Sequence, residues 1–160
     1  DMLLRRETEI GDMETAGELT QRLSEIGAQL LIDTLREYPN GSIVPQKQDE
    51  SRASYQPMLN REMARIDWRR SASEIACQVR GMNPWPMAFF VRGEKKIKVL
   101  ECRVAQGEKA APGTVLSTKP LLIQCAEGAV ELVKVTPEGG KPMAGEAWAL
   151  GQRFAKGDLV

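Results

Sequence analysis

The run Asn83-Pro84-Trp85-Pro86 constrains the fold of this chain more than any other feature. Each proline fixes its own φ and removes a backbone donor, so a single indole lies between two rigid positions. Asn83 and Trp85 each precede a proline, which biases both away from the α region. The run therefore predicts an extended corner at which a helix turns into a strand. A tryptophan in such a corner is expected to fill the core of a barrel.

A short helix is expected directly before this corner. Ser71-Ala72-Ser73-Glu74 matches a capping box, in which serine satisfies a free backbone N–H and glutamate reaches back to the serine. Ile75, Ala76 and Val79 follow at helical spacing and are expected to face inward. Gly81 ends the pattern, so the helix is predicted to join Trp68 to the corner.

Short strands are expected after the corner, separated by glycine and proline turns. Lys96 and Lys98 alternate with Ile97 and Val99, so both lysines are expected on the outer face of the sheet. So many short strands in one stretch predict a small closed barrel, with the oligonucleotide-binding (OB) barrel as the first choice. A short helix with Trp148 inward is expected over residues 144–151. The predicted strands are Met87–Val91, Lys96–Val104, Gly113–Ser117, Leu121–Cys125 and Ala129–Val135.

The first forty residues predict a strand, a turn and a helix. Met2–Ile10 has extended character, Thr15-Ala16-Gly17-Glu18 is another capping box, and Pro39-Asn40-Gly41 ends the helix. A single strand and helix cannot bury both faces of a sheet, so this piece is expected to belong to a larger α/β domain. The apolar stripe of the helix then predicts poor solubility or self-association of the chain alone. Residues 42–64 lack periodicity and are expected to form a linker.

The composition of the chain is informative about the class of protein and about the side chains available for catalysis or metal binding. With 42% hydrophobic and 28% charged residues, the chain is typical of a soluble globular protein. It shows no membrane-spanning apolar run and no secretory leader, so the cytoplasm is the expected compartment. The absence of histidine removes the commonest general base and metal ligand. Cys77, Cys102 and Cys125 have no metal-binding spacing and are expected to be small buried side chains.

The net charge of zero hides an uneven distribution along the chain. Residues 1–50 carry 11 acidic and 5 basic side chains, whereas residues 51–109 carry 6 acidic and 12 basic ones. Such asymmetry points to a polyanion as the partner of the basic segment, because cations on one wall of a barrel can follow a phosphate backbone. The alternative is that these are ordinary solvated surface charges. The candidate contact residues are Arg61, Arg65, Arg69, Arg70, Arg80, Arg92, Lys95, Lys96 and Lys98.

Seven motifs in order resemble the C-terminal half of methionyl-tRNA formyltransferase, and the resemblance covers essentially the whole chain. The pair Ile66-Asp67-Trp68 and Asn83-Pro84-Trp85-Pro86 at this spacing is its specific part. One departure is Met58, where members of the family usually carry a lysine just before the leucine that corresponds to Leu59. The motifs are Asp1-Met2-Leu3-Leu4, Glu14-Thr15-Ala16-Gly17-Glu18-Leu19, Gln48-Asp49-Glu50 with Tyr55, Arg65-Ile66-Asp67-Trp68, Arg80-Gly81-Met82-Asn83-Pro84-Trp85-Pro86, Ala111-Pro112-Gly113-Thr114-Val115 and Pro137-Glu138-Gly139-Gly140-Lys141.

The resemblance implies an architecture and a function. It implies the strand–helix end of a Rossmann-like formyltransferase domain at 1–41, an interdomain linker at 42–64 and an OB-like tRNA-binding barrel at 65–160. The family transfers a formyl group from 10-formyltetrahydrofolate to the amino group of methionyl initiator tRNA during translation initiation. Its catalytic asparagine, histidine and aspartate precede the first residue here, so Asp1 is not the catalytic aspartate. This chain is therefore expected to bind tRNA, to hold no cofactor or metal and to lack formyl transfer of its own.

Two other readings stay open from the sequence. The chain could be a stand-alone OB-type module for another nucleic acid, although residues 1–38 then have no evident purpose. It could also be the C-terminal domain of a formyltransferase that acts on a sugar nucleotide. The basic middle segment argues mildly against that second alternative.

Overall fold

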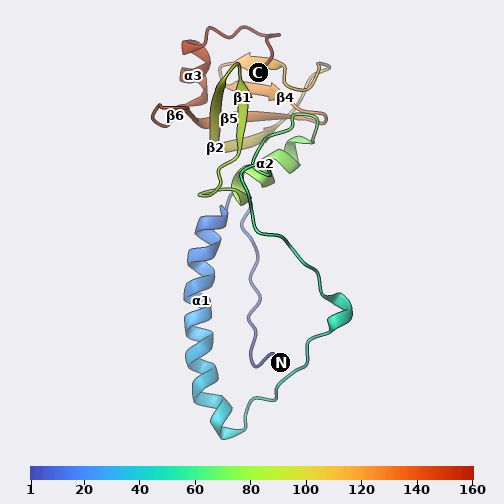
Figure 1. The fold of residues 1–160 in the computed structure, drawn as a ribbon, viewed down its shortest axis with the longest axis vertical. Coiled ribbons are helices and arrows are strands. Elements are labelled where there is room, and N and C mark those ends of the chain that lie inside the picture. The colour runs from blue at the N-terminus through green and yellow to red at the C-terminus, as the bar shows by residue number, and fades with distance from the viewer. The chain divides into compact units, whose positions relative to one another are not determined.

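The computed structural model describes residues 1–160 and divides them into two compact units, Asp1–Met58 and Leu59–Val160 (Figure 1). Each unit is described by itself. The boundary between the two units falls between Met58 and Leu59. The domain boundaries expected from the sequence, at residues 41 and 64, stay predictions. None of the helices combines the length and apolar character that crossing a membrane requires.

The unit Asp1–Met58 is built on one long helix, α1 (Ala16–Glu37). Its predicted capping box is present: the Glu18 backbone N–H donates to Thr15 Oγ1 at 3.3 Å, and the Thr15 N–H donates to Glu18 Oε2 at 2.9 Å. The helix ends as predicted, with the 3₁₀ turn η1 (Tyr38–Asn40) and then Gly41 at φ 73°. No residue of α1 is buried, and four of its large apolar side chains are exposed: Leu23, Leu31, Ile32 and Leu35. A second 3₁₀ turn, η2, covers Glu50–Arg52.

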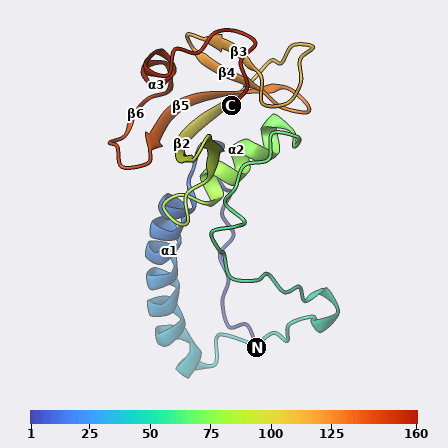
Figure 2. The same cartoon turned by 45° about the horizontal axis from the view of Figure 1, so that its top comes forward.

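The predicted strand over Met2–Ile10 is wrong. Only Met2 pairs, with Gln46, through backbone hydrogen bonds of 2.7 and 2.8 Å. A strand needs neighbours that accept and donate ladder hydrogen bonds, and this unit supplies none to the other residues. The segment instead lies beside α1 as extended chain (Figures 1 and 2).

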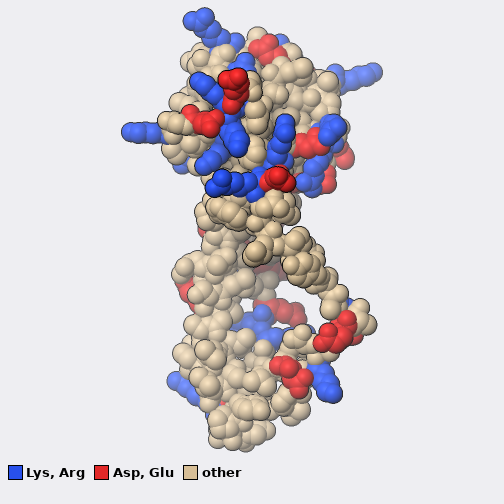
Figure 3. Space-filling model, in the orientation of Figure 1, with Lys and Arg blue, Asp and Glu red and all other residues tan.

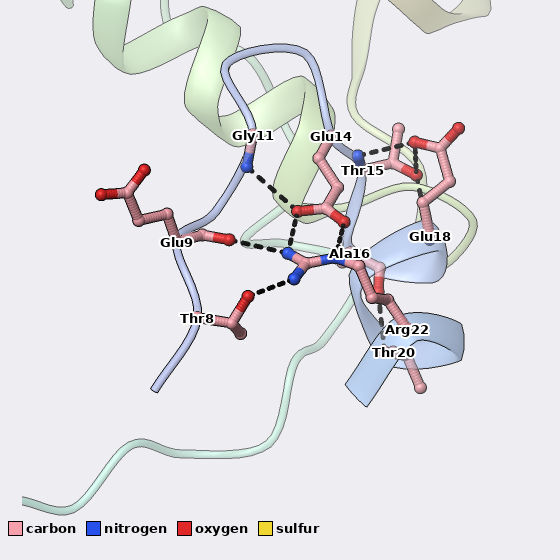
Figure 4. Close-up of polar contacts among 9 residues, drawn as sticks. All are labelled: Thr8, Glu9, Gly11, Glu14, Thr15, Ala16, Glu18, Thr20 and Arg22. Carbon is pink, nitrogen blue, oxygen red and sulfur yellow. Dashed lines mark hydrogen bonds and ion pairs between the residues drawn. The ribbon is translucent and has the colours of Figure 1, made fainter. Parts of the chain in front are cut away.

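One arginine of α1 fastens this preceding segment to the helix (Figure 4). Arg22 donates to both carboxylate oxygens of Glu14 at 2.8 Å, to the Glu9 carbonyl at 2.7 Å and to the Thr8 hydroxyl. The hydrogen bonds from Arg22, and one from the Gly11 N–H, lower the pKa of Glu14 to about 2. Arg22 therefore ties the segment before α1 to the helix, and its charge is balanced by Glu14.

The unit Leu59–Val160 contains a curled antiparallel sheet, a half-barrel, with two helices packed against it (Figure 2). The sheet order is β1-β2-β5-β4-β3, and β6 pairs with β5. The five predicted strands all form with shifted ends, whereas the two-residue β6 was too short to carry a pattern. The strands are β1 (Phe89–Arg92), β2 (Lys95–Ala105), β3 (Val115–Thr118), β4 (Leu121–Gln124), β5 (Ala129–Pro137) and β6 (Met143–Ala144).

The two ends of the sheet, β1 and β3, do not pair with each other, so strand pairing does not close the barrel. Each end is covered by other chain segments instead. The Ile66 N–H donates to the Phe89 carbonyl at 2.7 Å beside β1, and the Val115 N–H donates to the Asp158 carbonyl at 2.8 Å beside β3. Covered edges present fewer free backbone groups to other chains.

The two helices of this unit both pack against the sheet and contribute to one hydrophobic core. Helix α2 (Ala72–Gly81) carries the predicted capping box and buries Ile75, Ala76 and Val79 as predicted, against β2 and β5. Helix α3 (Gly145–Gly151) lies against β5 and β6 and buries Trp148, also as predicted. Burial of these apolar faces stabilises the unit by roughly 25 cal/mol for each Å² of apolar surface that is removed from water.

The expectation that Trp85 fills the core is wrong. Its side chain is 57% exposed, whereas Trp148 is 3% exposed. Edge-to-face contacts already fill the interior, with Phe90 5.5 Å from Trp68 and 5.7 Å from Trp148 between ring centroids. The corner after α2 turns at the surface, and its indole is left outside.

The expectation for the cysteines is correct for two of the three. Cys102 and Cys125 are buried, and burial raises the pKa of their thiols to about 12 and about 11. Cys77 is exposed, because it lies on α2 away from the inward stripe. All three are free thiols.

The cap of α2 makes the stability of this unit depend on pH. The N–H and hydroxyl of Ser71, followed by Arg70, hydrogen-bond to Glu74 and lower its pKa from 4.5 to about 2. Because the pKa is lower in the folded state, the contribution is complete above about pH 4.5 and is lost as pH falls towards 2. Glu74→Gln is therefore expected to destabilise the unit at pH 7 and to weaken its acid dependence. Urea unfolding at pH 7 and pH 3 measures both effects.

A matched control is Glu94→Gln, since Glu94 is an exposed acid in the β1–β2 turn and its side chain makes no hydrogen bond. Equal loss of stability in both variants at pH 7 would contradict the role of Glu74 as a cap.

Candidate functional site

Three of the candidate basic residues lie in one surface groove of the unit Leu59–Val160. Lys96 and Lys98 of β2 point outward, as their alternation with buried Ile97 and Val99 predicted. Arg61, from the segment before the sheet, lines the same groove, which has a volume of about 400 Å³. The fold therefore joins cations that are more than thirty positions apart in the sequence.

The rest of this groove is apolar and aromatic. The exposed Trp85 lines it with Pro84, Pro86 and Phe89. Phe89 stands opposite Lys98 in the β1–β2 register, and the Lys96 ammonium lies 5.2 Å from the Phe89 ring centroid. We refer to the groove lined by Arg61, Trp85, Phe89, Lys96 and Lys98 as the Trp85 groove.

A second groove lies on the other side of the same two lysines. It has a volume of about 260 Å³ and is lined by Lys96, Lys98 and residues 136–140. Glu138 is the one acid in it, and its carboxylate accepts a hydrogen bond of 3.1 Å from the Lys96 backbone N–H. Neither lysine ammonium forms an ion pair. Their charges are therefore available to a ligand from both grooves.

Two of the other candidates are partly neutralised by neighbouring acids. Arg69 donates to both oxygens of Asp67 at 2.9 and 2.8 Å, and these bonds with the Arg69 N–H lower the pKa of Asp67 to about 2. Arg70 forms an ion pair of 3.1 Å with Glu74. Both pairs are solvent-exposed and contribute little to stability.

The remaining candidates lie apart from the Trp85 groove. The guanidinium of Arg92 lies 3.8 Å from the Phe154 ring centroid and donates to Gln152 at 3.2 Å, so it is already engaged. Lys95 stands opposite Arg92 at the β1–β2 turn. Arg80 approaches Cys77 at the end of α2, and exposed Arg65 lies on the segment that pairs with β1.

The two aromatic members of the groove were not among the candidate contact residues, because the sequence favoured a core position over base stacking for the tryptophans. Phe89 neighbours Phe90 in a strand, so the sequence predicts that only one of the two faces inward, and the structure leaves Phe89 outside. Trp85 offered no such signal, since its exposure depends on which other aromatic residues fill the core. Figure 3 shows basic side chains spread over the visible face of this unit, with acidic ones among them.

No group of three or more histidine, cysteine, aspartate or glutamate side chains is arranged to hold a metal ion. The strongly lowered carboxyl pKa values belong to Glu14, Asp67 and Glu74, each of which pairs with an arginine.

Comparisons with solved structures show the fold. A variant of HypX from Aquifex aeolicus superposes with a TM-score of 0.65 at 18% identity, over 94% of this chain and 28% of that chain. HypX from the same organism in complex with tetrahydrofolic acid superposes with a TM-score of 0.58 at 20% identity, over 82% of this chain and 24% of that chain.

Curated relatives are more similar in sequence. The methionyl-tRNA formyltransferase of Solibacter usitatus (strain Ellin6076) is 45% identical over 161 aligned residues, covering 100% of this chain and 52% of the relative. That of Bacillus velezensis (strain DSM 23117 / BGSC 10A6 / LMG 26770 / FZB42) is 40% identical, again covering 100% and 52%. The chain thus spans about half the length of the curated relatives that it matches.

The family described as formyl transferase, C-terminal domain, matches residues 58–153, which is nearly all of the unit Leu59–Val160. This match and the relatives confirm the resemblance predicted from the tryptophan and proline motifs. The chain belongs to the formyl transferase C-terminal domain family, and its curated relatives are methionyl-tRNA formyltransferases.

Proposed function

We propose that the chain is the tRNA-holding part of an enzyme that formylates methionyl initiator tRNA in the cytoplasm, with 10-formyltetrahydrofolate as formyl donor. The observation that carries this proposal is the convergence of Arg61, Lys96 and Lys98 on one groove in a relative of methionyl-tRNA formyltransferases. Two further parts of the proposal are the OB-like character of the half-barrel and the origin of residues 1–41 as the end of a Rossmann-like domain.

The electrostatic argument rests on cations without acidic partners. Arg61, Lys96 and Lys98 form no ion pairs, so a phosphate would gain their charge without first breaking a salt bridge. A folded RNA is recognised mainly through its shape, its phosphates and its hydroxyl groups. Two grooves that share a lysine pair can follow such a backbone on both sides of β2.

The proposal assigns formyl transfer itself to residues outside this chain. Attack by an amine on a formyl group needs a proton acceptor and donors for the tetrahedral oxyanion. The chain has no histidine, and its most perturbed carboxylates are held by arginines or a helix cap. Turnover of 10-formyltetrahydrofolate by this chain alone would contradict that assignment.

Binding of initiator tRNA by the chain is expected to weaken steeply with salt. Each phosphate contact contributes a slope of about −0.9 to log K against log salt on duplex nucleic acid. The double variant Lys96→Gln with Lys98→Gln is therefore expected to reduce the slope by about 2. A filter-binding titration over a range of salt concentrations measures the slope directly.

Lys119→Gln is the matched control, because Lys119 is an exposed lysine that lines a separate groove with Leu150 and Phe154. It is expected to leave the slope nearly unchanged. A slope near zero for the unmodified chain would remove the electrostatic proposal altogether.

A further inference from the structure

The Trp85 groove combines an exposed indole with unpaired cations. Trp85 is 57% exposed although it is the largest side chain of its segment, and Pro84 and Pro86 hold the backbone on both sides of it. A rigid backbone reduces the entropy that such a side chain loses when a ligand stacks on it. The indole is therefore presented to solvent in a restricted position rather than on a loose loop.

The charges around the indole have one sign. Arg61, Lys96 and Lys98 line the groove together with apolar atoms of Met87 and Phe89, and no acidic residue lines it. Glu138, whose carboxylate accepts a hydrogen bond from the Lys96 backbone N–H, belongs to the neighbouring groove. A ligand that suits this groove has a flat apolar face and negative charge close to that face.

We propose that the Trp85 groove holds one unpaired nucleobase of an RNA, stacked on Trp85, with the flanking phosphates on Arg61, Lys96 and Lys98. This inference rests on the proposed function and adds a base-binding site to it. Base stacking on aromatic side chains, combined with a basic groove along the backbone, is the general way in which single-stranded nucleic acid is held. A base that is paired inside a helix cannot enter, so the site selects an unpaired nucleotide.

The test uses the full chain and a short single-stranded oligoadenylate that carries a fluorescent label. Trp85→Ala is expected to weaken binding about tenfold, because stacking on one aromatic residue accounts for a factor of that order. The salt dependence of the remaining binding is expected to stay the same, since the cations are untouched. Trp85→Phe is expected to recover most of the affinity, because phenylalanine also offers a stacking face.

The matched control is Tyr55→Ala, which removes an aromatic side chain of even greater exposure from the other unit. It is expected to leave oligoadenylate binding unchanged. Because Trp85 is exposed, the alanine variant is expected to fold, which circular dichroism checks.

The outcomes separate this inference from the proposed function. Equal binding by Trp85→Ala and the unmodified chain, or no binding of oligoadenylate at all, would overturn the stacking site. If the chain still bound initiator tRNA with a steep salt slope in that case, the proposed function would stand alone. Loss of binding in Trp85→Ala that Trp85→Phe restores supports the site.

Discussion

Gly145→Ala is expected to destabilise the unit Leu59–Val160 by about 3 kcal/mol. A Cβ on Gly145 would lie 1.7 Å from the Leu132 carbonyl oxygen, far inside contact distance. The clash is with the backbone of β5, so no side-chain rotation can relieve it. Helix α3 would have to move off the sheet and expose part of the face that buries Trp148. Urea unfolding followed by tryptophan fluorescence measures the effect, because all three tryptophans lie in this unit.

Gly151→Ala in the same helix is the matched control for Gly145→Ala. A Cβ at Gly151 meets nothing within 4 Å, and alanine is a better helix former than glycine by about 1 kcal/mol. This variant is therefore expected to be neutral or slightly stabilising. Equal effects of the two substitutions would show that α3 does not approach β5 as closely as the structure describes.

The parts of the fold that could be predicted from the sequence are those fixed by neighbours in the chain. Both capping boxes, at Thr15 and Ser71, form as predicted, because every atom involved lies within four residues. The outward placement of Lys96 and Lys98 was equally predictable, since alternation follows from strand geometry alone. Interactions between neighbouring residues therefore predicted both capped helices and the outward direction of Lys96 and Lys98.

The parts that could not be predicted depend on partners far along the chain. The expected strand over Met2–Ile10 does not form, because a strand needs a neighbouring strand and only Met2 has a partner here. Arg61 reaches the lysines only through the folding of the intervening α2 and β1. Arg92 looked as free as Lys96, but its guanidinium stacks on Phe154, more than sixty residues later. The candidate site was thus predictable as a set of charges and not as a groove.

Trp148→Ala is expected to cost about 4 kcal/mol of unfolding free energy, whereas Trp85→Ala is expected to change it by less than about 0.5 kcal/mol. Trp148 is 3% exposed and makes edge-to-face contacts with Phe90 at 5.7 Å and Phe154 at 5.3 Å between ring centroids. Its removal leaves a cavity and breaks both contacts, whereas more than half of the Trp85 side chain already faces solvent. Urea unfolding followed by the fluorescence of the remaining tryptophans measures both variants.

The comparison of the two tryptophans also decides what the proline-flanked corner is for. If Trp85→Ala were as costly as Trp148→Ala, the indole would be a structural plug and its exposure in the structure would be wrong. Retained stability in Trp85→Ala together with weakened oligoadenylate binding would instead separate the two roles, because a loss of affinity could not then be a loss of folding. A total stability of only about 5–15 kcal/mol makes a 4 kcal/mol difference between the variants readily measurable. The corner would then be a surface device that holds an indole outward beside Arg61, Lys96 and Lys98.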